Sequence, residues 1–340
     1  MNRLRLYKQA GEHWFPILIC VIAVTLFSHG AVPALHAEDI PQRGFSSPEE
    51  AVNALIGAVR AEDMEEMLAI LGPGSRVLIY SGDDVADRTG RKKFIRAFDR
   101  KNTLQKEAED RMIIYIGEDN WPMPIPIVKT GPSWMFDPEE GKQEILNRRI
   151  GRNELHVMEV LGAYVEAQHE YASRDSRGEG VVEFAQQLIS SEGERDGLYW
   201  EVKEGKEESP LGPLIARASR KGYKDDDISP FYGYYYKILK AQGKHADGGA
   251  YDYVVNGKMI LGFALIAYPA EYSNSGVMTF MVNQQGVIYE KNIGGDTRSI
   301  AEKIEIFDPE DTWTKVEDII HEEKSAVRQA PVFRPGVPHD

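Results

Sequence analysis

Histidines are the first residues of this chain whose type could support acid–base or metal chemistry. Beyond the first 37 residues there are five, and none has the H-x-H or H-E-x-x-H spacing of a metal site. His156 and His169 share a predicted helix, where thirteen residues at about 100° each place them on different faces. One metal ion cannot be bound by both, so the open alternatives are a single histidine acting as general base and a solvated helix histidine.

Acidic side chains cluster in three segments, of which residues 225–227 are interpreted as a solvated loop. Asp83 and Asp84, with Asp87 close behind, could bind a cation, and residues 175–180 are similar to a calcium-binding loop. In that loop Arg177 stands where an oxygen ligand belongs, and the liganding glutamate of the twelfth position is missing. Turn formation is therefore the favoured interpretation, and we expect no cofactor.

Nucleophile and phosphate-binding motifs are missing from the sequence. No G-x-S-x-G elbow, S-x-x-K motif, P-loop or G-x-G-x-x-G occurs in the context that its chemistry requires. A triad assembled from distant positions stays open, but no local pattern points to one.

Aromatic residues gather in two parts of the chain. Residues 121–126 combine a tryptophan with three prolines, which cannot donate to a central sheet ladder, so we expect an edge strand able to dock a peptide. Three later segments, residues 196–200, 209–213 and 231–236, could together line a groove whose rings stack on a glycan or peptide. The candidate ligand-contacting residues are Trp121, Tyr199, Trp200, Tyr232, Tyr234 and Tyr236. The alternative is ordinary packing in a surface strand or a β core.

The N-terminal residues have the order of a secretory signal peptide. A basic leader precedes an apolar run over residues 14–27, and alanines follow at positions 34 and 37. We expect cleavage after Ala37 and a periplasmic or secreted product. The alternative is a retained membrane anchor, for which this run falls short of the ~20 residues that span a bilayer.

The exported chain is expected to be acidic and free of cysteine. It would carry 37 Lys and Arg against 53 Asp and Glu, and Cys20 would be removed with the apolar run. Disulfides, cysteine nucleophiles and cysteine metal sites are then excluded. The acidic surplus argues against a non-specific nucleic-acid binder, and no later apolar run is long enough to span a membrane.

Helix signals followed by short apolar runs predict a first α+β domain over residues 44–140. Ser47, Pro48 and Glu50 form a capping box at the start of one helix, and Asp63 caps a second that Gly72 ends. A third helix is expected from about residue 91 to residue 106. The expected strands are residues 112–116, 125–128 and 133–136.

A long helix packed on an antiparallel sheet is predicted for a second domain over residues 150–318. Asn153 is expected to cap a helix over residues 154–172, with the domain boundary in residues 138–151. A hairpin turn is expected at Asn256-Gly257. The expected strands are residues 232–236, 263–268, 277–282 and 287–289. The fold class is thus α+β, with a disordered tail over residues 322–340.

Seven short motifs follow one another in a familiar order. They are FSSPEEA (45–51), WPMPIP (121–126), RRIGRNE (148–154), AQHEY (167–171), DGLYW (196–200), SPLGP (209–213) and GVMTF (276–280). Together they resemble the bacterial domain-of-unknown-function family 2950 (DUF2950) over nearly all of residues 44–315. The resemblance implies a secreted or periplasmic protein of Gram-negative bacteria and brings no activity or site residues. The first half is also similar to NTF2-like domains. The second half is similar to a pseudopilin headgroup, although no prepilin leader joins directly to its helix.

Three functions are compatible with these features. The leading hypothesis is a non-catalytic envelope protein that binds a partner protein or a glycan or peptide polymer. The alternative is a periplasmic hydrolase whose site is assembled from scattered residues such as Asp83, Asp87 or His169. A factor that assembles a surface structure differs from the first mainly in its partner.

Overall fold

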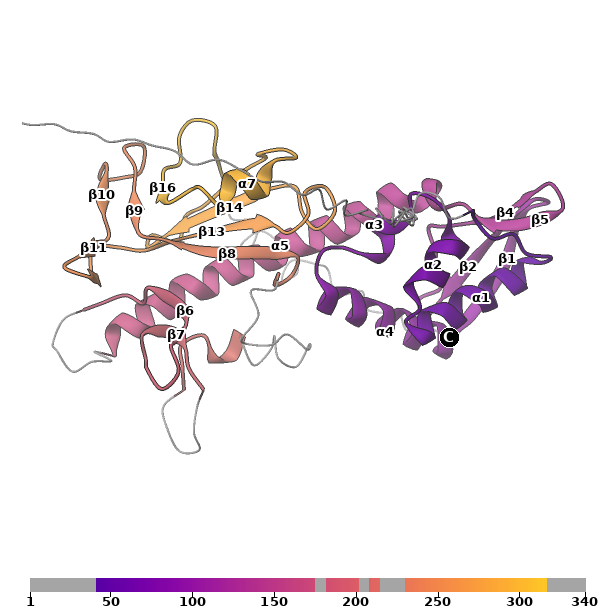
Figure 1. The fold of residues 1–340 in the computed structure, drawn as a ribbon, viewed down its shortest axis with the longest axis horizontal. Helices are drawn as coiled ribbons and strands as arrows, with labels where there is room; N and C mark the ends of the chain where they lie inside the picture. The colour runs from indigo at the N-terminus through magenta and orange to yellow at the C-terminus, as the bar shows by residue number, and fades with distance from the viewer. Residues whose placement is uncertain (1–40, 175–181, 202–207, 215–229, 317–340) are drawn as a thin grey trace, which may run out of the picture. The chain divides into compact units, whose positions relative to one another are not determined.

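Figure 1 shows the fold in a computed structural model, which describes residues 41–174, 182–201, 208–214 and 230–316. These residues form helices and mainly antiparallel sheets, which confirms the predicted α+β class. No helix in these ranges is long and apolar enough to cross a membrane. The predicted signal peptide, the acidic segments 175–180 and 225–227 and the predicted tail all lie outside the described residues.

Four helices and a five-stranded antiparallel sheet enclose the first hydrophobic core. The helices are α1 (Pro48–Ala61), α2 (Met64–Leu71), α3 (Arg76–Ile79) and α4 (Asp84–Arg100). The strands are β1 (Asn102–Ala108), β2 (Arg111–Ile116), β3 (Trp121–Pro122), β4 (Ile127–Thr130) and β5 (Ser133–Phe136). They run in the order β1-β2-β4-β5, with β3 also paired to β2. The apolar faces of α1 and α2 supply much of this core.

The ends of α1 and α2 follow the predicted local signals. The Ser47 side chain accepts a hydrogen bond from the Glu50 N–H at 3.1 Å, and Pro48 opens the helix. The Glu50 carboxylate reaches one residue beyond the expected capping box, to the Ser46 N–H at 2.9 Å, and its hydrogen bonds to Ser46 lower the pKa of Glu50. Asp63 caps α2, which ends at Gly72 with a φ of 88°.

The predicted limits of the third long helix were wrong at both ends. Helix α4 begins at Asp84, because the Asp83 side chain caps it by accepting a hydrogen bond from the Ala86 N–H at 2.9 Å. Residues 102–106, expected to be helical, belong to β1 and pair in register with β2. Pairing with β2 stabilises these residues as a strand more than their intrinsic helix propensity stabilises a helix.

The predicted start of the long helix at residue 154, capped by Asn153, was wrong, because residues 138–153 already belong to α5 (Pro138–Ser173). Pro138 opens this helix, and Asn153 is a buried residue within it, donating from Nδ2 to the Ser275 carbonyl at 2.9 Å. Ile145 packs on the first core, whereas Val157 and Leu161 belong to the second. The division into domains over residues 44–140 and 150–318 stays a prediction.

The second core lies between α5 and a second five-stranded sheet. That sheet is antiparallel in the order β17 (Thr314–Lys315), β15 (Ile288–Lys291), β14 (Thr279–Asn283), β13 (Ala264–Pro269) and β8 (Tyr234–Leu239). The limits of its four longest strands lie within three residues of the predicted runs. The smaller elements are β6 (Gln187–Ile189) with β7 (Gly197–Tyr199), β9 (Ala241–Gln242) with β10 (Tyr251–Asp252) and β16 (Ile306–Phe307), and α7 (Thr297–Ala301). The predicted hairpin turn is confirmed, since Asn256 and Gly257 have φ of 52° and 80° between β11 (Val254–Val255) and β12 (Lys258–Met259).

Candidate ligand pocket

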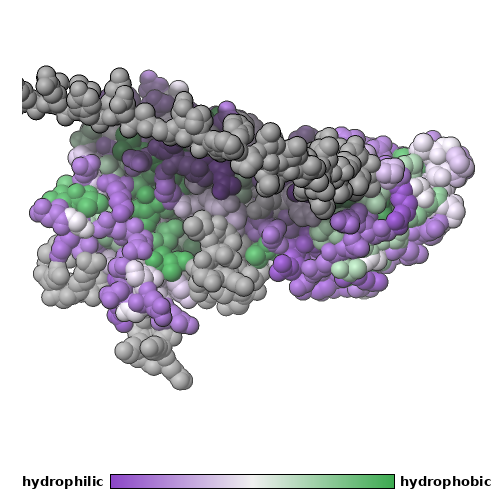
Figure 2. All heavy atoms as spheres, viewed as in Figure 1, coloured by the Kyte–Doolittle hydropathy of each residue, from purple (hydrophilic) through white to green (hydrophobic). Residues whose placement is uncertain are grey.

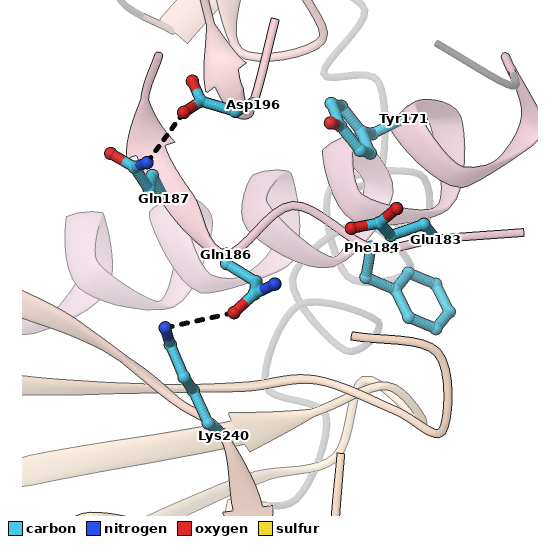
Figure 3. A pocket seen from close by; sticks show the side chains of 7 residues that line it. All are labelled: Tyr171, Glu183, Phe184, Gln186, Gln187, Asp196 and Lys240. Atoms are coloured by element: carbon cyan, nitrogen blue, oxygen red, sulfur yellow. Dashed lines mark hydrogen bonds between the residues drawn. The ribbon is translucent and has the colours of Figure 1, made fainter. Parts of the chain in front are cut away.

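A pocket of about 300 Å³ opens beside the C-terminal end of α5 (Figure 3). Its lining comes from α5, from the start of β6 and the segment before it, from the residue before β7 and from the residue after β8. The lining residues are Tyr171, Glu183, Phe184, Gln186, Gln187, Asp196 and Lys240. The volume is at the lower end of the range for small-molecule sites, ~300–1,000 Å³.

A buried glutamine of α5 positions the segment that forms one wall. The Gln168 side chain, fully buried, donates from Nε2 to the Ala185 carbonyl at 2.8 Å and accepts from the Ala185 N–H at 2.9 Å. On the other side, the Phe184 N–H donates to the Met259 carbonyl at 2.7 Å. Because this backbone is held from both sides, the side chains at positions 183–187 have defined places in the wall.

The opposite wall is held by the carboxylate of Asp196. Its Oδ1 accepts from the Ser191 N–H at 2.8 Å, while Oδ2 accepts from the Ser191 hydroxyl at 2.8 Å and from Gln187 Nε2 at 2.9 Å. Gly197 allows the close approach of β6 and β7, since a Cβ there would lie 2.7 Å from the Ile189 carbonyl carbon. The Tyr171 hydroxyl donates to the Arg195 carbonyl at 2.7 Å and so ties this wall to α5.

Lys240 supplies a cation at the edge of the pocket. Its Nζ donates to Gln186 Oε1 at 3.2 Å, and Gln186 Nε2 donates to the Gly257 carbonyl at 2.8 Å. Figure 3 shows Lys240 extending toward Gln186, and Gln187 facing Asp196. Lys240 forms no ion pair within the part of the chain that the structure describes, so its ammonium keeps donors for an anionic or carbonyl group of a ligand.

The chemistry of this lining is that of non-covalent polar recognition. Amide, carboxylate and ammonium groups stand beside two aromatic rings, a combination that suits a polar ligand with an apolar face. Hydrogen bonds among the lining residues already fix most of these groups, which lowers the entropy lost on binding. Nothing in the sequence had brought these residues together, although Tyr171 and Asp196 belong to two of the seven motifs.

The six predicted aromatic contacts divide between the two cores. Trp121 packs half-buried on the first core, while Tyr199 and Tyr236 lie half-buried against the second. Trp200, Tyr232 and Tyr234 are buried within that second core. The Tyr234 hydroxyl donates to the Met278 carbonyl at 3.0 Å, and its burial raises the pKa of Tyr234. Ordinary core packing accounts for the three buried rings, and ligand contact by the six aromatic residues stays a prediction.

The predicted acidic residues surround the start of α4. Asp83 is 1% exposed; while Oδ1 caps the helix, Oδ2 accepts from the Gly233 N–H at 2.9 Å. Asp84 is exposed in the first turn. Asp87 accepts from the Ser81 N–H at 2.8 Å, and burial raises the pKa of Asp87. Across the described ranges no group of three or more His, Cys, Asp or Glu side chains is arranged to hold a metal ion.

The two histidines of α5 contact different residues, as the helical geometry predicts. The His156 ring stacks on Tyr232 with centroids 4.2 Å apart. The His169 ring packs edge-on against Phe184 and Phe263, and its Nε2 lies 3.3 Å from the Gln284 carbonyl oxygen. His169 therefore borders the pocket through Phe184 without lining it.

A family model described as "Protein of unknown function (DUF2950)" matches residues 42–316 of the chain. No curated protein and no solved structure matches it. The likenesses of the two halves to NTF2-like domains and to a pseudopilin headgroup therefore stay predictions.

Proposed function

Since this chain belongs to the DUF2950 family, whose function is unknown, we propose that it is an exported, non-catalytic binding protein that holds an envelope polymer in the pocket beside α5. The observation that carries the proposal is the pre-arranged polar lining, in which Gln187 and Asp196 bind one another while Lys240 keeps donors for a ligand. A glycan or peptide end has the hydroxyl, amide and carboxylate groups that such a lining recognises.

Export is part of the same proposal. Its support is the order of basic leader, apolar run and small residues within positions 1–37. A size shift on export, seen by immunoblotting of whole cells and periplasm, is the expected result. An uncleaved chain that fractionates with the membrane would contradict it.

The hydrolase alternative draws less support from the positions of its candidate residues. Both carboxylate oxygens of Asp83 accept backbone hydrogen bonds, and Asp87 binds the backbone of Ser81. A structural role accounts for these contacts. His169 borders the pocket but contacts the rings of Phe184 and Phe263.

Calorimetric titration with purified, soluble peptidoglycan fragments tests the pocket. Lys240→Met keeps the length of the side chain and removes its charge, so we expect about ten- to hundredfold weaker binding, as for a lost hydrogen bond from a charged donor. Lys244→Met is the matched control, because Lys244 is exposed, lies four residues further along the chain and does not line the pocket. Equal weakening by both variants, or no binding by the parent, would contradict the proposal, and turnover of the fragments would favour the hydrolase.

A further inference from the structure

The exposed face of α4 is strongly basic in an otherwise acidic chain. Residues 88–101 contain seven Lys and Arg against one Asp, so the rest of the chain has 33 Lys and Arg against 53 Asp and Glu. Figure 2 shows hydrophilic residues over the part of the surface where Figure 1 places α4. Such a charge asymmetry orients a protein in the field of an anionic partner.

Helical spacing places these cations in one row. Arg88, Lys92, Arg96 and Arg100 are four residues apart, so successive side chains advance about 6 Å along the helix and the row extends about 18 Å. Lys93 lies beside the row. Phe94 and Phe98 lie on the opposite side of the helix and pack on or within the first core, and Ile95 packs on that core from the edge of the row. We call Lys92, Lys93, Arg96 and Arg100 the basic face; all four side chains are exposed.

In the part of the chain that the structure describes, the acidic residues next to the basic face pair with other cations. Asp99, the one acidic residue of this stretch, pairs with Arg60 of α1, and Glu62 lies 3.9 Å from Arg88. No residue of the basic face forms an ion pair with any described residue. Like charges four residues apart destabilise a helix, so folding stability does not explain the row.

We propose that the basic face binds the surface of an anionic lipid bilayer. Clusters of four to eight Lys and Arg on an amphipathic helix have the charge that anionic headgroups attract, and the acidic remainder of the chain would be held away from that surface. A linear polyanion is the less suitable partner, because the basic face lies on a single convex helix and has no aromatic side chain on which sugars or bases could stack. The large apolar side chains of α4 pack toward the core, so binding is peripheral, without insertion.

Co-sedimentation of the full chain with lipid vesicles tests this proposal. Vesicles of phosphatidylcholine alone are compared with vesicles in which phosphatidylglycerol is about one lipid in three. The basic leader and the apolar run within residues 1–27 are the same in every variant, so the readout is the ratio of the two affinities and its change from one variant to the next. We expect this ratio to be well above one near 0.1 M salt and to approach one near 1 M, where the Debye length shrinks from about 10 Å to about 3 Å.

A double variant connects the binding to α4. Lys92→Gln with Arg96→Gln removes two cations and is expected to lower the affinity for anionic vesicles by about 25-fold, at about fivefold for each charge. The matched control, Lys244→Gln with Lys303→Gln, removes the same charge from exposed positions of the second half and is expected to change the affinity less than about threefold. Because relief of like-charge pairs does not destabilise α4, the first variant is expected to melt no lower than the parent.

Three results would overturn the proposal. One is equal affinity of the parent for neutral and anionic vesicles. Another is equal loss of affinity in the two double variants. The third is tight binding of soluble polyphosphate with no preference for anionic vesicles, which would assign the basic face to a linear polyanion.

Discussion

Asp83 offers the sharpest test of the structure, because its two carboxylate oxygens have separate roles. Oδ1 caps α4 through the Ala86 N–H, and Oδ2 accepts the Gly233 N–H, 150 residues away in the sequence. The side chain is 1% exposed, so water does not replace either bond. Asp83→Ala removes both acceptors, whereas Asp83→Asn keeps an oxygen for the helix cap and presents an amide NH₂ to the Gly233 N–H.

The structure sets the magnitude of each effect. Loss of an N-cap costs about 0.5–2 kcal/mol, and a buried donor left without an acceptor costs about 1–3 kcal/mol. We therefore expect Asp83→Asn to lower the free energy of unfolding by about 1–3 kcal/mol through Gly233 alone. Asp83→Ala is expected to lower it by about 2–4 kcal/mol. Asp84→Ala, the exposed neighbour, is expected to cost no more than about 1 kcal/mol through the helix dipole.

Urea unfolding followed by circular dichroism measures these differences. The midpoint gives the stability change where the slope against urea is the same for all variants. The expected order of stability is parent, Asp84→Ala, Asp83→Asn and Asp83→Ala. Native-state hydrogen exchange adds a local readout, because the Gly233 amide is expected to lose protection in both Asp83 variants.

Two outcomes would refute this reasoning. If Asp83→Asn were as stable as the parent, the contact with Gly233 would not contribute to the native state. If Asp83→Ala cost less than Asp84→Ala, the buried carboxylate would be held against its own preference, as functional carboxylates are. That second outcome would return Asp83 to the hydrolase hypothesis.

Three further predictions concern packing, titration and the pocket wall. Gly276→Ala is expected to lower the free energy of unfolding by about 1–3 kcal/mol, because its Cβ would lie 2.0 Å from the hydroxyl oxygen of buried Tyr234. Gly162→Ala is the control: its Cβ, within α5, would point into open space, and we expect a higher melting temperature. Burial raises the pKa of Asp87, so ionisation of this carboxyl lowers the free energy of unfolding as the pH rises from its ordinary pKa of 3.8 through the folded pKa. Asp87→Asn is therefore expected to be more stable than the parent near neutral pH. In urea melts over a series of pH values, this advantage is expected to disappear below pH 3.8. Gln168→Leu removes both hydrogen bonds to Ala185, so it is expected to lower the free energy of unfolding in urea by about 2–4 kcal/mol and to weaken binding of the peptidoglycan fragments. The control is Gln143→Leu at an exposed position, which is expected to change that free energy by no more than about 0.5 kcal/mol.

Features that depend on a few neighbouring residues could be predicted from the sequence. The caps at Ser47 and Asp63 and the turn at Asn256-Gly257 contain their own hydrogen-bond partners or backbone preferences within four positions. The basic face belongs to the same class, because a spacing of four residues is visible in the sequence. The helix predicted over residues 91–106 already contains all four of its residues, and the structure adds that they are exposed and form no ion pair with the described residues.

Features that depend on distant partners could not be predicted. Residues 102–106 continue an acceptable helical pattern, and only their pairing with β2 makes them a strand. The same holds for Asn153, a good helix cap by type, whose amide instead binds the Ser275 carbonyl from within α5. The pocket draws its lining from four separate segments, so no window of sequence contains it.

The tyrosine-rich strand shows why composition alone does not separate a core from a binding groove. A buried tyrosine needs a partner for its hydroxyl, and an exposed one finds it in water or a ligand. Here Tyr164 donates to the Ala264 carbonyl, Tyr234 to that of Met278 and Tyr236 to that of Phe231. Two of these three carbonyls are more than forty residues away in the sequence. For Tyr164 and Tyr234 the acceptor is thus supplied by a distant part of the chain, and the spacing of tyrosines along one strand does not reveal it.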